Sequence, residues 1–291
     1  MNAESRTGDT APPSHKTDST PRASRIDPRR LLADTLVRDV EAHESLGSTN
    51  TRAMELAQRA RIATPLLVIT GRQTAGRGRG SNTWWSSDGA LTFSLLVEAI
   101  PFGLSPELWP RVALASGVSV CDALEELLPG APLGLKWPND VYLAGRKVAG
   151  ILTEVPAIPP SLPARLVIGV GINVNNSFAA APPELQPLGV ALVDVAGSSF
   201  DLTDVLIRVL RRLEANLRSL ATSDPRLPAR WRKLNLLTGQ CLTVRQGPRQ
   251  VEGLCAGIDD DGALLLDTPE GRQRIVGGTV VPSFRRGKSS S

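Results

Sequence analysis

The feature that most limits the fold of this chain is a short apolar segment that continues directly into glycines and arginines. The two parts read TPLLVIT at residues 64–70 and GRQTAGRGRG at residues 71–80. An uninterrupted apolar run of this length predicts a short buried strand. The glycine–arginine segment is therefore fixed to a folded element, whereas nucleic-acid-binding RG segments normally lie in disordered, low-complexity sequence.

The spacing within residues 71–80 excludes two familiar phosphate-binding loops. A Walker A loop needs lysine and then serine or threonine after its second glycine, whereas Arg-Gly follows Gly76. A dinucleotide-binding turn needs a third glycine where this chain has Ser81. The glycines permit close approach to a ligand, and Arg77 and Arg79 offer forked donors to phosphate or carboxylate. The segment is thus either a cover over an anionic ligand or a basic surface loop.

A second segment with unusual chemistry reads KWPNDVYLAGRKVAGILTE at residues 136–154. It predicts a strand, a turn and a strand, with a hairpin-like reversal at LAGRK. Lys147 lies among small and apolar residues of a core strand. We expect it to be paired or functional, because burial of a lone ammonium is costly. Asn139 and Asp140 either close the turn or bind a ligand.

Two shorter polar segments complete the candidate site. GSTN at residues 47–50 begins a predicted helix, and its side chains either cap that helix or contact a polar ligand. GVGINVN at residues 169–175 belongs to a predicted core strand. Glycines at 169 and 171 indicate tight packing or close approach of a ligand, and Asn173 adds an amide.

The remaining pattern predicts further strands and helices. We expect a strand at 89–98, a helix at about 107–128 and an amphipathic helix from Asp201. After residue 239, short β segments with regular turns suggest a small barrel, with a turn at 259–262. The helix from Asp201 carries arginines that are expected to form a solvated face: Arg208, Arg211, Arg212 and Arg218.

Composition indicates how the chain is divided into domains and in which cellular compartment it is expected. Residues 1–30 are polar and rich in Pro, Ser and Thr, which predicts a disordered extension before a large domain at 31–232 and a small one at 233–291. Residues 1–40 are too short and polar for a DNA-binding domain, so we expect no DNA partner. Three cysteines without CxxC spacing and only two histidines argue against a disulfide framework, a His-based triad and a protein metal site. No segment has signal-peptide or transmembrane length, so we expect a cytoplasmic enzyme without a membrane partner.

The order of these motifs resembles the biotin protein ligase family over roughly residues 44–286. The motifs are STN, RQTAGRGRG with a following Trp, KWPNDVYLAGRKVAGILTE and GVGINVN. The resemblance implies an α+β fold, with a mixed β-sheet flanked by helices, related to class II aminoacyl-tRNA synthetases, and a C-terminal SH3-like barrel. It also implies a monomer or weak homodimer.

The implied activity is ATP-dependent and has two steps. Biotin and ATP form biotinyl-5′-AMP with Mg²⁺ assistance, and the biotinyl group then passes to a lysine of a biotin carboxyl carrier protein, as in acetyl-CoA carboxylase. Adenylation joins a carboxylate to a triphosphate, so cations and exclusion of water matter more than a nucleophile. The scarcity of histidine fits this chemistry.

The resemblance also assigns roles to residues of this sequence. Four would line the biotin pocket: Ser48, Thr49, Asn50 and Gln73. Three would fold over the ligand and hold its carboxylate and phosphate, and Arg79 would also be catalytic: Arg77, Gly78 and Arg79. Lys147 would contact biotin at the reacting carboxylate and α-phosphate, and Asp140 would assist the attacking lysine. The nucleotide end would include Trp84, Lys136, Asn139 and Asn173.

The chain departs from the family pattern after Arg79. Family members commonly read GRGR-x-G-R, whereas Gly80, Ser81 and Asn82 stand here. Two other functions compete with biotin ligation. A lipoate or octanoate ligase would typically carry an RR-x-GGG-x-V-H-D motif, which is missing, and a nucleic-acid-binding module would use the RG segment for salt-dependent binding.

Overall fold

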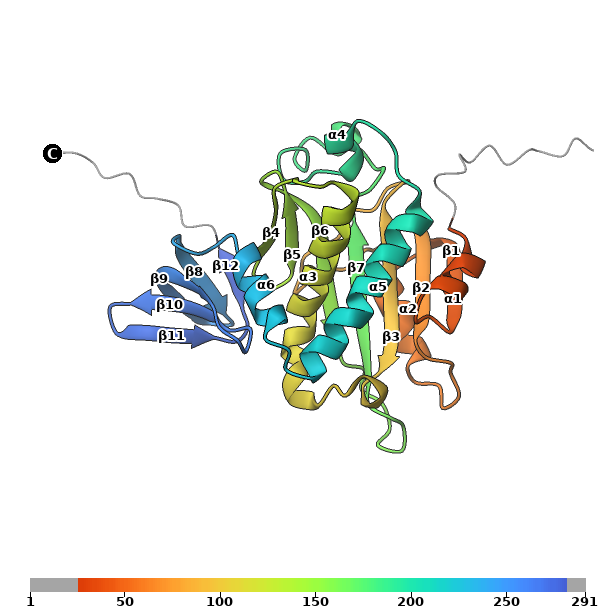
Figure 1. The fold of residues 1–291 in the computed structure, drawn as a ribbon, viewed down its shortest axis with the longest axis horizontal. Helices are drawn as coiled ribbons and strands as arrows, with labels where there is room; N and C mark the ends of the chain where they lie inside the picture. The colour runs from red at the N-terminus through yellow and green to blue at the C-terminus, as the bar shows by residue number, and fades with distance from the viewer. Residues whose placement is uncertain (1–25, 282–291) are drawn as a thin grey trace, which may run out of the picture.

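The computed structural model describes residues 26–281, which build two β-sheets (Figure 1). The larger sheet has seven strands in the order β1-β2-β3-β7-β6-β5-β4. Among these strands β1 and β2 run parallel, and the other neighbouring pairs are antiparallel. The strands are β1 (Asp39–Leu46), β2 (Leu66–Gln73), β3 (Leu91–Glu98), β4 (Leu133–Lys136), β5 (Asp140–Leu143), β6 (Arg146–Glu154) and β7 (Arg165–Ile172).

Helices cover both faces of this sheet. Helices α3 and α5 lie together on one face, and α2 packs on β2, β3 and β7 from the other (Figure 1). In β2, Leu67 faces the α3–α5 core whereas Leu66 and Val68 face α2, so the strand is buried on both sides, as predicted. The helices are α1 (Pro28–Asp34), α2 (Thr49–Leu56), α3 (Trp109–Leu127), α4 (Leu192–Ala196), α5 (Leu202–Ala221) and α6 (Arg226–Leu234). Among residues 26–281, no helix combines the length and apolar character needed to cross a bilayer.

The second sheet is antiparallel and follows α6. Its five strands, in the order β11-β10-β9-β8-β12, are β8 (Cys241–Gln246), β9 (Arg249–Ile258), β10 (Leu264–Thr268), β11 (Gly271–Ile275) and β12 (Thr279–Val281). The predicted turn at 259–262 joins β9 to β10. It contacts Trp137, which follows β4 of the larger sheet, and Trp231 of α6. Trp137 Nε1 donates to the Gly262 carbonyl at 3.0 Å, and Trp231 Nε1 donates to the Asp259 carbonyl at 3.1 Å. The turn is therefore held by two buried indoles.

Several expected elements are confirmed, and one segment is more complex than expected. The helix expected at 107–128 is α3, the strand expected at 89–98 contains β3, and the core strand expected to include residues 169–175 is β7, which ends at Ile172. The LAGRK reversal is a hairpin turn with positive φ at Ala144 (49°) and Gly145 (76°). The segment predicted as two strands is three, because the chain turns once between β4 and β5 and again between β5 and β6.

The sequence pattern missed the helices α1, α4 and α6 and the strand β1. Helix α1 begins at Pro28, inside the segment predicted as an extension, while residues 1–25 of that prediction lie outside the described residues. Strand β1 is an edge strand with mostly exposed or half-buried positions, so it lacks the apolar alternation that predicts strands. Helix α6 contains Pro228, which reads as a helix breaker but lies in the first turn, where its missing N–H costs nothing.

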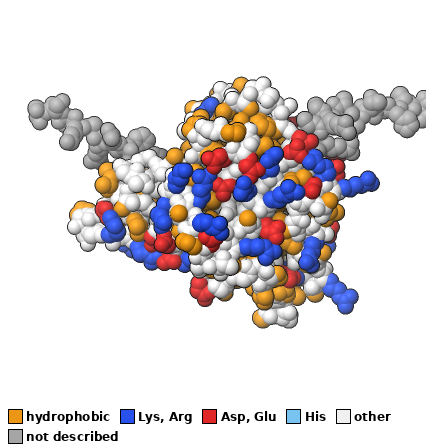
Figure 2. All heavy atoms as spheres, viewed as in Figure 1, with side chains coloured by type: hydrophobic (Ala, Val, Ile, Leu, Met, Phe, Trp, Pro, Cys, Tyr) orange, Lys and Arg blue, Asp and Glu red, His pale blue; other side chains and the backbone are white. Residues whose placement is uncertain are grey.

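The arginines of α5 form a face of mixed charge. Arg208 and Arg212 both contact Glu126, at 2.7 and 2.6 Å, and Arg211 contacts Asp34 at 3.3 Å. Figure 2 shows acidic side chains interspersed with basic ones over this side of the molecule. The face matches the predicted solvated surface better than a continuous basic patch for nucleic acid.

Arg165, the first residue of β7, links the larger sheet to the chain that follows α2. Its side chain is 1% exposed, and Nη1 donates to the carbonyls of Ala57 and Arg59 at 2.7 and 2.8 Å, while Nη2 lies 3.3 Å from Glu98. Replacing Arg165 by Met should lower the free energy of unfolding by about 3 kcal/mol, because buried acceptors lose their donors. Urea denaturation measures this.

The exposed Arg38 provides the matched control for that measurement. Arg38→Met should change the free energy of unfolding by at most about 0.5 kcal/mol. An equal, small effect of both substitutions would show that Arg165 does not anchor α2.

Candidate active site

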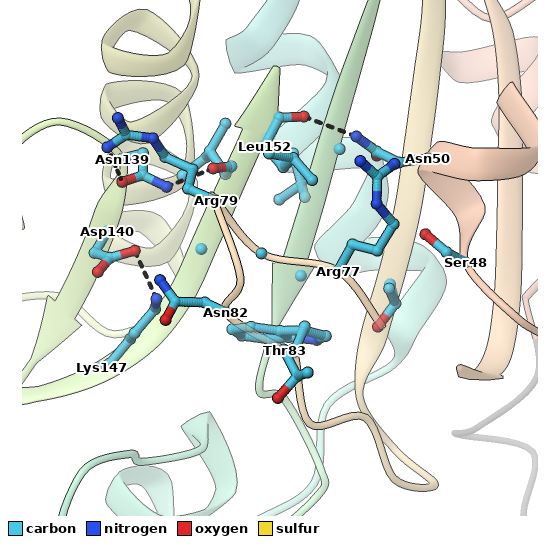
Figure 3. A pocket seen from close by; sticks show the side chains of 18 of the residues that line it. Ser48, Asn50, Arg77, Arg79, Asn82, Thr83, Asn139, Asp140, Lys147 and Leu152 are labelled. Atoms are coloured by element: carbon cyan, nitrogen blue, oxygen red, sulfur yellow. Dashed lines mark hydrogen bonds and ion pairs between the residues drawn. The ribbon is translucent and has the colours of Figure 1, made fainter. Parts of the chain in front are cut away.

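A cavity of about 410 Å³ opens between the glycine–arginine segment, the end of β2, the β4–β5 turn, β6, β7 and β12 (Figure 3). It brings together all but one of the site residues predicted from the sequence. These are Ser48, Thr49, Asn50, Gln73, Arg77, Gly78, Arg79, Trp84, Lys136, Asn139, Asp140 and Lys147. The segments that carry them are up to a hundred residues apart in the chain, and antiparallel pairing of β3, β7, β6 and β5 brings them to one place.

One end of the cavity has a buried, neutral polar floor. Ser48 caps α2, and the Thr49 N–H donates to Gln73 Oε1 at 2.8 Å. Ser94 Oγ lies 2.6 Å from Asn50 Oδ1 and 2.8 Å from Thr49 Oγ1. All five side chains are less than 9% exposed. Because they hold one another in fixed orientations, they suit a small neutral ligand group with its own donors and acceptors.

The two strand glycines lie where backbone and side chains approach closely, as predicted. A Cβ at residue 169 would overlap the Asn50 amide, and one at residue 171 would overlap the Trp84 indole. A Cβ at residue 150 on the neighbouring strand would lie 3.4 Å from Trp84 and 3.3 Å from the end of Lys147. Trp84 can therefore lie close to β6 and β7 because both strands have glycine there.

The other end of the cavity is cationic. Lys147 Nζ lies 2.6 Å from Asp140 Oδ1 and 5.8 Å from the centre of the Trp84 ring, which confirms that this lysine has a partner. Arg79 Nη1 lies 3.4 Å from Asn139 Oδ1, and Asn139 Nδ2 donates to the Ile151 carbonyl at 2.7 Å (Figure 3). Burial lowers the pKa of the Arg79 guanidinium, while the Asp140 charge opposes that shift. The guanidinium stays charged at neutral pH.

Residues 76–84 form a tight hairpin over the cavity, named here the glycine–arginine hairpin. The Gly78 N–H donates to the Asn82 carbonyl at 2.8 Å, and the Trp84 N–H donates to the Gly76 carbonyl at 3.0 Å. At the tip of the hairpin, the Asn82 N–H donates to the Arg79 carbonyl at 3.2 Å, and Gly80 has a φ of 62°. The departure from the family pattern therefore places glycine at the left-handed position of the turn.

The segment 177–199, which includes α4, supports the strand that carries Lys147. The Lys147 N–H donates to the Leu188 carbonyl at 3.1 Å, and the Val190 N–H donates to the Lys147 carbonyl at 3.0 Å. Asp194 closes this segment by accepting from Ser177 Oγ. Burial opposes ionisation of Asp194, yet its hydrogen bonds hold the pKa of the carboxyl below its ordinary value.

Asn173 is the predicted site residue that does not line the cavity. It is 2% exposed, its N–H donates to the Val148 carbonyl at 2.9 Å, and its Oδ1 accepts from Asn176 at 3.1 Å. These hydrogen bonds stabilise the turn that follows β7, so the Asn173 side chain does not face the cavity. Sequence reasoning missed Thr279 and Val280 of β12, which do line the cavity. Their segment reads only as a strand, with no polar signature of a site.

Comparisons with known proteins agree on one family. Residues 42–173 match the Biotin/lipoate A/B protein ligase family, and residues 239–281 match the Biotin protein ligase C terminal domain. A biotin--[acetyl-CoA-carboxylase] ligase of Mycobacterium tuberculosis is 34% identical over 266 residues, covering 87% of this chain and 92% of its own length. A bifunctional ligase/repressor of Bacillus subtilis is 35% identical over 236 residues, covering 80% of this chain and 70% of its own.

Comparison with solved structures indicates the same family. A biotin protein ligase of Aquifex aeolicus, solved in complex with biotin and ATP, is similar with a TM-score of 0.72 and 29% identity. The match covers 84% of this chain and 98% of that one. The likeness thus includes both sheets and the helices that flank the larger one.

Proposed function

This chain belongs to the biotin protein ligase family, and we propose that it joins biotin to ATP and transfers the biotinyl group to one lysine of a biotin carboxyl carrier protein. The observation that carries this proposal is the polarity of the cavity. A neutral, hydrogen-bonding floor at Asn50 and Gln73 lies at one end, and Lys147 and Arg79 lie at the other. Biotin has the same division between a neutral ureido ring and an anionic carboxylate.

In the first step, a biotin carboxylate oxygen attacks the α-phosphorus of ATP. The new P–O bond gives biotinyl-5′-AMP, and the bond to the β-phosphate oxygen breaks to release pyrophosphate. Lys147 and Arg79 would neutralise the charge that builds up where two anions meet, and fixed cations in a partly buried site do this well. The glycine–arginine hairpin would exclude water that hydrolyses the anhydride.

In the second step, the ε-amine of the carrier lysine attacks the biotinyl carbonyl and AMP leaves. The attacking amine must be neutral, and Asp140 is the carboxylate among the described cavity-lining residues that could accept its proton. The side-chain oxygens of Asp140 and Asn139 are ligands of the kind that Mg²⁺ prefers, so these two residues would hold an Mg²⁺ ion bound to ATP, which would offset part of the phosphate charge.

We propose that the β8–β12 sheet is an SH3-like barrel and that the larger domain is related to class II aminoacyl-tRNA synthetases. The short antiparallel strands in the order β11-β10-β9-β8-β12 support the first. We further propose a cytoplasmic protein, which the unoxidised thiols of Cys121 and Cys255 support. We also propose that it is a monomer or weak homodimer.

Direct biotinylation tests this function. Incubation with biotin, MgATP and a carrier-protein domain should place biotin on one carrier lysine, found by mass spectrometry of the digested carrier. Lipoate in place of biotin is the control for the nearest rival. If lipoate but not biotin drives ATP–pyrophosphate exchange, the substrate assignment is wrong. Salt-dependent RNA binding without AMP production would favour the nucleic-acid rival.

Arg79 provides a test of the hairpin as a cover. Arg79→Gly removes the half-buried guanidinium that faces the anionic end, so biotinyl-5′-AMP should escape about tenfold faster. Escaped intermediate labels exposed lysines on a bystander protein, which a streptavidin blot detects. Wild-type levels of bystander labelling would contradict the role of Arg79 as a retaining group.

A further inference from the structure

Glu154 joins the two sides of the neutral end of the cavity without lining it. It is the last residue of β6, and its side chain is 21% exposed. Arg77 of the glycine–arginine hairpin donates to both of its oxygens, from Nη1 at 3.0 Å and from Nη2 at 2.7 Å. Asn50 of the floor donates to Glu154 Oε2 at 2.9 Å. One carboxylate therefore contacts both the cover and the floor.

This geometry separates the two arginines of the hairpin. Arg77 has a bidentate carboxylate partner and lies beside Asn50 (Figure 3), whereas Arg79 contacts the neutral Asn139 among the described residues. A guanidinium has five N–H donors, so the fork to Glu154 leaves three for a ligand. With its charge compensated, Arg77 is suited to orientation, and Arg79 is left as the cation for the anionic end.

We propose that Glu154 is a positioning residue that holds Arg77 and Asn50 in their ligand-binding orientations before biotin enters. This inference rests on the proposed biotin ligation. Its physical basis is preorganisation: a hairpin already fixed to the sheet loses less conformational freedom when the ligand binds. Glu154 also keeps the Asn50 amide oriented, because Oε2 accepts one Nδ2 proton while the Leu152 carbonyl accepts the other at 3.1 Å.

Glu154→Gln is the sharpest substitution for this idea. A glutamine oxygen can still accept from Asn50, but its NH₂ group cannot accept from Arg77, so only the ionic fork is broken. The dissociation constant for biotin, measured by calorimetry, should rise about fivefold, and KM for biotin should rise in parallel. The maximal rate of ATP–pyrophosphate exchange at saturating biotin should fall by less than twofold, because Arg79 and Lys147 are untouched.

Asp267→Asn is the matched control. Asp267 accepts a similar fork from Arg272, at 2.7 and 3.0 Å, in the C-terminal sheet away from the cavity. It should leave biotin affinity unchanged. If Glu154→Gln leaves biotin affinity at the wild-type value, Glu154 does not position the site. If it tightens biotin binding, the fork competes with the ligand for Arg77, which also overturns the proposal.

A double-substitution cycle separates positioning from a general structural role. Arg77→Gln acts on the exposed hairpin, so it reports on the same contact if Glu154→Gln fails to fold. In the Arg77→Gln background, Glu154→Gln should weaken biotin binding by less than twofold further. Additive losses would contradict the coupling. Failure of the wild-type chain to form biotinyl-5′-AMP would instead refute the proposed function, so the two failures are distinguishable.

Discussion

Replacing Lys147 by Ala is expected to lower biotin-dependent ATP–pyrophosphate exchange by about a thousandfold, at the upper end of the effect of removing one preorganised donor. Two causes act together. The ammonium that, in the proposed reaction, would face the reacting carboxylate and phosphate is lost. Asp140, which is 2.6 Å from Lys147 Nζ, is left with an uncompensated negative charge where two anions must meet. Exchange assays at saturating biotin and MgATP measure the loss.

The fold should survive this substitution, because the Lys147 side chain is 33% exposed and its partner 23%. The free energy of unfolding should change by about 1 kcal/mol or less. Lys233→Ala, at an exposed lysine of α6, is the control and should keep wild-type exchange. The double variant Lys147→Ala/Asp140→Asn should regain part of the substrate affinity but not the rate. Near wild-type exchange by Lys147→Ala would remove Lys147 from the mechanism.

The second large effect is expected at a residue with no side chain. Gly169→Ala would place a methyl group where the Asn50 amide lies. That amide is 4% exposed and is held by Ser94, Leu152 and Glu154 at 2.6, 3.1 and 2.9 Å, so it cannot move without losing these bonds. Overpacking and lost hydrogen bonds together cost about 3 kcal/mol, which corresponds to roughly a hundredfold weaker biotin binding.

Titration calorimetry with biotin alone measures this effect without ATP or a carrier protein. Gly277→Ala is the matched control, because a Cβ there meets no atom within 4 Å. It should bind biotin like the wild-type chain. A biotin affinity within threefold of wild type in Gly169→Ala would show that Asn50 is not part of the biotin pocket.

Most strands and helices of the larger domain and most residues of the cavity could be predicted from the sequence, because the pattern that indicates each one lies within a short segment. The apolar run before the glycine–arginine segment, the glycines at 169 and 171, and a lysine on a core strand each allow only one or two physical explanations, and the structure shows which neighbour accounts for each. The partner of Lys147 could be expected, since a buried ammonium needs one. Its identity as Asp140 depends on the register of β5 against β6, which includes a bulge after Val141.

The parts that could not be predicted depend on long-range pairing. Glu154 becomes significant only when β6 ends beside α2 and the hairpin, and Val280 only when the second sheet packs at the cavity mouth. Asn173 is the opposite case, because it is a predicted site residue that does not line the cavity. Its residue type and position suit a ligand contact, but backbone geometry after β7 turns its side chain toward Asn176.

The turn at 259–262 has a consequence for when activity arises during synthesis. Ser48 and Val280, which are far apart in the chain, both line the cavity. The Trp137 indole donates its hydrogen bond to the Gly262 carbonyl. A nascent chain whose last strands are still inside the ribosomal exit tunnel lacks that part of the cavity lining and that acceptor. We therefore expect no reactive anhydride to form co-translationally, so unfinished enzyme cannot acylate the newly made polypeptides around it.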